Sequence, residues 1–173
     1  AISPRMRRLR LHGDLGNFAN GGLHVRMLLP PCEADTGVAP AWPTLQDDGR
    51  LQWPPGQARM ARRTYTIRDI DVDAAWMDID VLLHPSGGGA DGEPVDAPGS
   101  DWAAQARPGN LVGMLSPGSG VLPIAQRYVM VADACALPAA ARMLQNLTCG
   151  ASTALLLWVA QDDDTQASIE WLH

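Results

Sequence analysis

The chain has 173 residues, and 46% of them are hydrophobic, which is enough for a core in one domain or in one domain and part of a second. Its net charge of −6 argues against nonspecific binding to nucleic acids or to anionic membranes. No apolar run approaches the roughly 20 residues of a membrane helix, and no signal peptide is visible. Three widely spaced cysteines (Cys32, Cys135 and Cys149) form no CxxC pair, so we expect neither a zinc site nor a disulfide framework. A cytoplasmic protein with free thiols is the simplest interpretation.

The first two thirds of the chain have the pattern of short strands. Alternating or β-rich runs predict strands at 6–13, 23–30, 63–72, 75–84 and 111–117, with a tight turn near Asp73 and Ala74. A short helical turn is expected at 14–22, and "SDWAAQA" predicts an N-capped helix over 100–106. Residues 31–61 read as a long irregular loop and 85–99 as a Gly/Pro/Asp insertion. This succession predicts an antiparallel barrel over residues 1–122.

The pattern changes after residue 122. The near-continuous apolar run 127–133 predicts a buried parallel strand, 137–147 a helix, 152–160 a second buried strand and 168–173 a third. Residues 123–173 are therefore expected to form a partial α/β domain with a parallel sheet. A barrel followed by such a unit is a common layout for flavin reductases, in which the barrel holds the flavin and the α/β unit brings the nicotinamide.

Five stretches, in this order, cover most of the chain: "SPRMRRLRLHGDLGNFANGGLHVRMLLPP", "RRTYTIRDID", "MDIDVLLH", "SDWAAQARPG" and "VADACALPAAARML". Together they resemble the siderophore-interacting protein family, the FAD-dependent ferric-siderophore reductases of the ferredoxin-reductase-like group. The resemblance implies FAD as cofactor, NAD(P)H as reductant and a ferric siderophore as substrate. Similar proteins continue beyond a segment like the one at the end of this chain, so we expect a fragment or a natural truncation.

The resemblance identifies the strand with Arg63, Tyr65 and Thr66 as the flavin-binding strand. Arg63 offers a planar fork of donors for a phosphate oxygen, and Tyr65, on the same side of the strand, can lay its ring against the isoalloxazine. Thr66 can hydrogen-bond near the flavin N5. Arg68 lies on the other side and has no clear role. The alternative is an edge strand with solvated arginines.

Two further segments are assigned to the cofactor by the same resemblance. His84 is placed beside the flavin, and the block Ser100, Asp101, Trp102 and Ala103 opens a helix whose N-terminus suits a pyrophosphate. Ser100 can cap this helix and touch phosphate, and Trp102 can close over the cofactor. Asp101 would repel a pyrophosphate unless its carboxylate points outward. The alternatives are a strand-end histidine that faces solvent and an ordinary helix start with a packed tryptophan.

The segment "VADACALPAAAR" lies at the first strand-to-helix turn of the α/β unit, where a nicotinamide nucleotide would lie. The family pattern here is similar to Gly-Asp-Glu-Thr-Ala-Leu-Pro. Asp133 is kept, whereas Ala132 and Ala134 replace the glycine and the glutamate. Cys135 is either a reactive thiol near the flavin or, as we favour, a buried small residue.

These residues lead to the hypothesis of an FAD-dependent ferric-siderophore reductase. NAD(P)H, or a ferredoxin donor, reduces FAD, and the flavin passes single electrons to Fe(III). Arg5, Arg7 and Arg8 either attract an anionic ferric chelate or, as we favour, form a solvated strand face. One alternative is a degenerate module that binds flavin or siderophore without turnover, which the alanines at 132 and 134 favour. Another is a structural barrel without a ligand.

Overall fold

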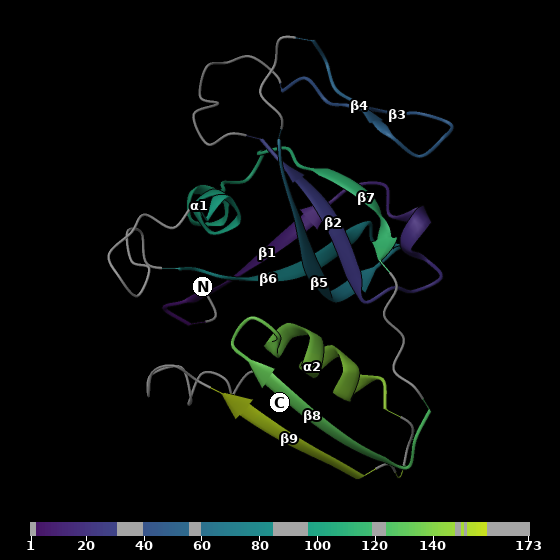
Figure 1. Cartoon of the computed structure of the whole chain (residues 1–173), viewed down its shortest axis with the longest axis vertical. Helices are drawn as coiled ribbons and strands as arrows, with labels where there is room; N and C mark the ends of the chain where they lie inside the picture. The colour runs from purple at the N-terminus through teal and green to yellow at the C-terminus, as the bar shows by residue number, and fades with distance from the viewer. Residues whose placement is uncertain are drawn as a thin grey trace.

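The protein is described here by a computed structural model that covers residues 3–30, 40–55, 60–84, 97–118, 124–147, 150 and 152–158. A larger unit of strands lies above a smaller α/β unit (Figure 1). The strands are β1 (Met6–His12), β2 (His24–Leu29), β3 (Thr44–Leu45), β4 (Leu51–Gln52), β5 (Ala61–Asp71), β6 (Trp76–Leu82), β7 (Gly113–Gly118), β8 (Arg127–Asp133) and β9 (Ser152–Trp158). The helices are α1 (Pro98–Gln105), α2 (Leu137–Gln145) and the short 3₁₀ helix η1 (Gly16–Phe18).

The strands predicted from alternation are confirmed, with two differences within the described residues. The short hairpin β3–β4 lies inside the segment that was expected to be irregular. Helix α1 begins at Pro98 rather than at Ser100. Proline has a fixed backbone φ and no N–H, so it suits the first turn of a helix and starts this one earlier. The third strand expected at 168–173 lies outside the described residues.

The larger unit is a five-stranded antiparallel sheet in the order β1-β6-β5-β2-β7. The pairings within the described residues do not join β1 to β7, so closure into a barrel stays a prediction. Strand β5 is shared between two halves of the sheet. It pairs with β2 over residues 61–66 and with β6 over residues 67–71, with a register shift between Ile67 and Asp69.

The core lies on the inner face of this sheet. Val25 and Met27 are fully buried, whereas Arg26 is exposed, as their alternation predicts. Helix α1 adds Trp102 and Ala103 to the same apolar cluster. One face of the sheet and one side of α1 therefore form the core of the larger unit.

The hairpin between β5 and β6 turns where the sequence predicted it. The Asp71 carboxylate accepts a hydrogen bond from the backbone N–H of Ala74 at 2.8 Å, and the N–H of Ala75 donates to the carbonyl of Val72 at 3.2 Å. Ala75 has a φ of 57°, in the left-handed region that favours glycine.

We expect Ala75→Gly to stabilise the protein by about 0.5–1 kcal/mol. Glycine relieves the left-handed strain of the alanine Cβ, and this gain exceeds the extra chain entropy that glycine loses on folding. Urea unfolding measures the difference, and Ala74→Gly, one residue earlier in the turn, is the control. A loss of stability in Ala75→Gly would show that the left-handed conformation of Ala75 is not strained.

The smaller unit is a βαβ arrangement in which β8 and β9 pair in parallel over seven residues each. Helix α2 lies between this two-stranded sheet and the larger unit (Figure 1). Ala132 is buried, but Val129 and Val131 are 71% and 74% exposed. The prediction that β8 is a parallel strand is confirmed. Its predicted burial is wrong for these two valines in the described structure, because α2 covers one face of the sheet and the valines lie on the other.

Candidate functional site

The proposed flavin strand lies in the half of β5 that pairs with β2. Arg63 is opposite Met27 and Tyr65 is opposite Val25, and directly opposed residues share a face of the sheet. Arg63 is exposed, whereas Tyr65 is half-buried and packs against the core cluster. Burial raises the pKa of the Tyr65 phenol, and the nearby Arg63 guanidinium partly offsets this rise. The strand therefore presents a neutral aromatic ring beside an exposed cation.

Helix α1 begins directly on these two side chains. A Cβ atom built on Gly99 would overlap the Tyr65 hydroxyl and would lie 3.4 Å from Cγ of Arg63. Only glycine lets the first turn approach so closely. Gly99 lies at the end of the 85–99 segment that we read as an insertion, and sequence reasoning gave it no role. The sequence contained one signal for this role: Gly99 immediately follows Pro98, and proline is typical of the first turn of a helix.

Ser100 and His84 meet at the same turn. The Ser100 side-chain oxygen accepts a hydrogen bond from the backbone N–H of His84 at 2.8 Å. Ala97 is the N-cap residue, so the prediction that Ser100 caps the helix is wrong. Its hydroxyl instead ties the end of the β6 segment to α1. The histidine itself is exposed.

The remaining α1 residues face in two directions. Trp102 and Ala103 are buried in the core cluster, and Asp101 is exposed, pointing outward as a nearby phosphate would require. A role of Trp102 or Ala103 in contacting a cofactor stays a prediction. Thr66 is only 8% exposed and lies opposite His24 at the end of the β2-paired half of β5. Its contact with a flavin also stays a prediction.

Asp133 and Cys135 belong to a separate turn between β8 and α2. The Asp133 side chain accepts a hydrogen bond from the backbone N–H of Ala136 at 2.9 Å, which fixes the start of α2. The expected burial of Cys135 is wrong, because the residue is exposed. Partial desolvation and the Asp133 carboxylate nevertheless raise the pKa of its thiol, while Arg5 lowers it. In the described structure no hydrogen bond or ion pair joins Asp133 or Cys135 to Arg63 or Tyr65.

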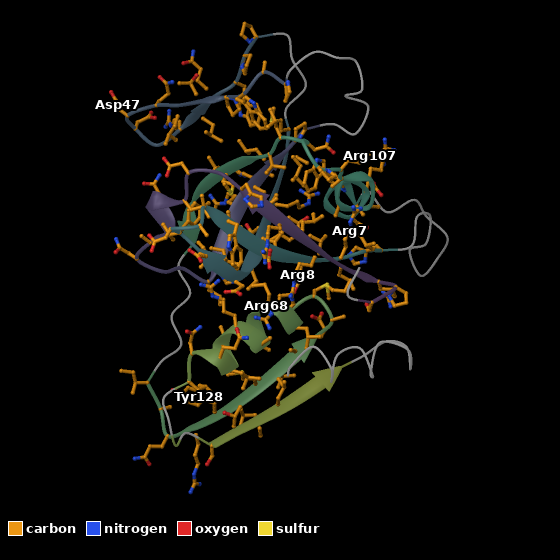
Figure 2. The ribbon with its side chains drawn as sticks, turned by 180° about the vertical axis from the view of Figure 1, so that it is seen from behind. Arg7, Arg8, Asp47, Arg68, Arg107 and Tyr128 are labelled. Atoms are coloured by element: carbon orange, nitrogen blue, oxygen red, sulfur yellow. The ribbon has the colours of Figure 1, made fainter. Side chains whose placement is uncertain are left out.

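The arginine-rich start of the chain forms internal contacts. Arg7 donates to the carbonyls of Ala103 at 2.5 Å, Ala104 at 2.7 Å and Ala106 at 2.7 Å, at the C-terminus of α1 (Figure 2). A cation there satisfies helix carbonyls and complements the helix dipole. Arg7 thus holds α1 from the end opposite to Gly99.

The next two arginines form cross-strand ion pairs. Arg8 makes two 2.8 Å hydrogen bonds to Asp80, and Arg10 makes two to Asp78. Both carboxylates are buried, and each pair adds a direct bond that raises the pKa of its arginine. The predicted solvated arginine face is confirmed only in part: Arg8 is exposed, but its guanidinium pairs with Asp80, and the guanidinium of Arg7 binds helix carbonyls. The matching two-residue spacing of the arginines and the aspartates was the signal for this pairing.

The part of the chain that the structure describes holds no group of three or more His, Cys, Asp or Glu residues placed to bind a metal ion. None of its helices combines the length and apolar character needed to cross a membrane.

Comparison with known proteins gives a consistent picture. Residues 1–121 match the siderophore-interacting FAD-binding domain. The chain is 25% identical to the ferric vibriobactin reductase ViuB of Vibrio cholerae over 183 residues, which cover 99% of this chain and 62% of that protein. It is 32% identical to a siderophore utilization protein from T. fusca, with a TM-score of 0.71 and coverage of 95% of this chain and 59% of that one.

More distant structures show the fold alone. The cytochrome b5 reductase domain of Ulva prolifera nitrate reductase has a TM-score of 0.63 at 14% identity, with coverage of 99% of this chain and 64% of that one. The chain spans about three fifths of the length of the siderophore-related relatives.

Proposed function

Because the chain belongs to the siderophore-interacting FAD-binding domain family, we propose that it is the flavin-binding portion of a ferric-siderophore reductase. The observation that supports this proposal best is the contact of the first turn of α1, at Gly99, with Arg63 and Tyr65. It joins a cation, an aromatic ring and a helix N-terminus in one place. The chain covers 62% of ferric vibriobactin reductase, so the activity of a whole reductase is part of the proposal.

The chemistry of these groups fits a flavin dinucleotide. The backbone N–H of Asp101 is the first to bond within α1, to the carbonyl of Ala97, so the amides of Gly99 and Ser100 precede the helical ladder. Together with the exposed Arg63 guanidinium they suit a pyrophosphate. The half-buried ring of Tyr65 suits one face of the isoalloxazine.

Each residue then has a defined task. Arg63 and the first turn of α1 hold the phosphates, Tyr65 orients the flavin ring, and Thr66 donates a hydrogen bond near N5. Bound FAD supplies the conversion of a two-electron donor into single-electron transfers. NAD(P)H, at the turn with Asp133, or a ferredoxin is the electron source, and a ferric siderophore is the acceptor.

Iron release follows from the ligand chemistry of the proposed substrate. The hard oxygen ligands of a siderophore hold Fe(III) more tightly than Fe(II), so reduction favours release. A cytoplasmic location stays a prediction.

A visible absorption spectrum of the purified chain, with and without added FAD, tests the function first. Flavin bands that persist through gel filtration support it, and anaerobic NADH or NADPH should then bleach them. Ferric chelate added to the reduced chain should restore the oxidised bands. A protein that is colourless after gel filtration, even when FAD was added beforehand, would exclude the flavin function.

A second candidate function is a flavin- or siderophore-binding module without turnover. Ala132 and Ala134 favour it, since they replace a glycine and a glutamate of the family pattern at the nicotinamide turn. The flavin-binding version of this module would bind FAD that dithionite reduces but that NADH and NADPH do not reduce. The same anaerobic titration therefore separates the two functions.

We expect Gly99→Ala to weaken FAD binding on the order of tenfold, because the added methyl group pushes α1 away from Tyr65. Isothermal titration with FAD measures the affinity. Gly13→Ala is the matched control, since a Cβ at Gly13 would lie 3.7 Å from the Met114 methyl carbon, an ordinary contact distance. Equal FAD affinity in both variants would show that the α1 contact does not shape the site.

A further inference from the structure

Strand β5 contains a bulge directly after the flavin-binding segment. Ile67 pairs with Ile79, and Asp69 pairs with Asp78, so two steps along β5 match one step along β6 and Arg68 is the extra residue. A bulge interrupts the ladder and redirects a side chain. It accounts for the position of Arg68, which simple alternation left without a role.

Helix α2 contacts this bulge through two polar side chains of its C-terminal half. The Arg142 guanidinium donates to the backbone carbonyl of Ile67, and the Arg68 guanidinium donates to the Gln145 side-chain oxygen at 2.8 Å. Arg142 and Gln145 are three residues apart and share a helix face. Figure 2 shows Arg68 at the boundary between the sheet and α2. One hydrogen bond is thus donated from α2 to β5, and the other is donated from β5 to α2.

Both guanidinium groups are partly buried at this contact. Desolvation lowers the pKa of Arg68 and that of Arg142, and the carboxylate of Asp69 opposes the shift in each case. Positive charge is kept at the interface because hydrogen bonds and Asp69 compensate for lost water. A contact built from directed bonds fixes orientation more tightly than apolar packing alone.

On the premise of the flavin function above, we propose that Arg142 and Arg68 are positioning residues that clamp α2 to the β5 bulge. The clamp contacts β5 at Ile67 and Arg68, one and two residues beyond Thr66. Helix α2 has nine residues and is about 13 Å long, and the turn with Asp133 and Cys135 precedes its other end. The clamp therefore sets where the electron-donor turn lies relative to the flavin strand.

The distance between the two units tests the clamp without a cofactor. One nitroxide label is attached to Cys135 and another to Asp73→Cys in the β5–β6 turn, with the other two cysteines changed to serine. Pulsed electron spin resonance then gives the distribution of label distances. We expect Arg142→Ala and Arg68→Gln to broaden the distribution about twofold, since domains move unless an interface holds them.

Two further variants separate positioning from simple loss of packing. Arg142→Lys keeps the charge and is expected to broaden the distribution less than Arg142→Ala. The exchange Arg68→Gln with Gln145→Arg rebuilds the hydrogen bond in the opposite direction and should restore the narrow distribution. Arg62→Gln, an exposed arginine on the same strand, is the control that leaves it unchanged.

The flavin gives the second readout. In the FAD-loaded chain, Arg142→Ala should slow flavin reduction by NADPH about tenfold while the Kd for FAD stays within about twofold of the parent. A chain that binds no FAD contradicts the proposed function, and a chain whose FAD is reduced by neither NADH nor NADPH supports the second candidate function. In both cases the label distances still decide the clamp. Unchanged distributions in Arg142→Ala and Arg68→Gln, or an exchange that fails to restore the parent distribution, would overturn it.

Discussion

A chain that carries both Arg63→Ala and Tyr65→Ala is expected to purify without flavin. Removing the guanidinium costs a charge-assisted bond to phosphate, and removing the ring costs its stacking on the isoalloxazine. Together these losses are about 3–4 kcal/mol, which corresponds to an FAD affinity roughly 100- to 1,000-fold weaker. Fluorescence titration with FAD and the absorption spectrum after gel filtration measure the effect.

Arg62→Ala is the matched control for this experiment. Arg62 precedes Arg63 on β5, points to the opposite face and is equally an exposed arginine. Arg62→Ala should leave the FAD affinity unchanged if the loss in the double variant depends on the position of the arginine rather than on the total charge. A doubly substituted protein that still purifies yellow would refute the assignment of the site to Arg63 and Tyr65.

Arg8→Ala is expected to lower the free energy of unfolding by about 2–3 kcal/mol. The side chain of Asp80 is fully buried, so the substitution removes the two hydrogen bonds of a buried carboxylate to Arg8 and leaves it the electrostatic attraction of Arg68. The Arg8 side chain is 37% exposed, and water screening there keeps the effect below that of a fully buried pair. Urea unfolding followed by circular dichroism measures the change.

The control is an ion pair of the same residue types on the surface. Arg50 lies 3.6 Å from Asp48, and both side chains are mainly exposed, so Arg50→Ala should change stability by less than about 0.5 kcal/mol. Equal losses in Arg8→Ala and Arg50→Ala would show that burial of Asp80 does not govern the contribution of its pair.

The strands of the larger unit were predictable because burial of one face imposes alternation. Val25 and Met27 on one side of β2 and Arg26 on the other are an example. Strand β8 was interpreted from a different pattern. Its continuous apolar run predicted burial on both faces, and that prediction was wrong. Val129 and Val131 are exposed, since a hydrophobic run states what a strand can bury and not what covers it.

The candidate site was predictable where residues are close in sequence. Arg63 and Tyr65 stand two apart on one strand, so their common face follows from strand geometry. The contact with Gly99 and the bond between Ser100 and His84 depend on where α1 packs, which local pattern does not determine. The bulge at Arg68 also escaped prediction, because it is a property of the pairing of two strands.

The separation between β1 and β6 along the chain also affects how the protein is made. Arg8 and Asp80 are separated by 72 residues along the chain. At typical rates of synthesis, β1 is therefore made roughly 4–15 s before the partner residues of β6. A nascent strand without a partner is prone to aggregate, and closely spaced like charges oppose association with other chains. We therefore expect the arginines of β1 to oppose aggregation of the nascent chain, in addition to their pairing in the finished sheet.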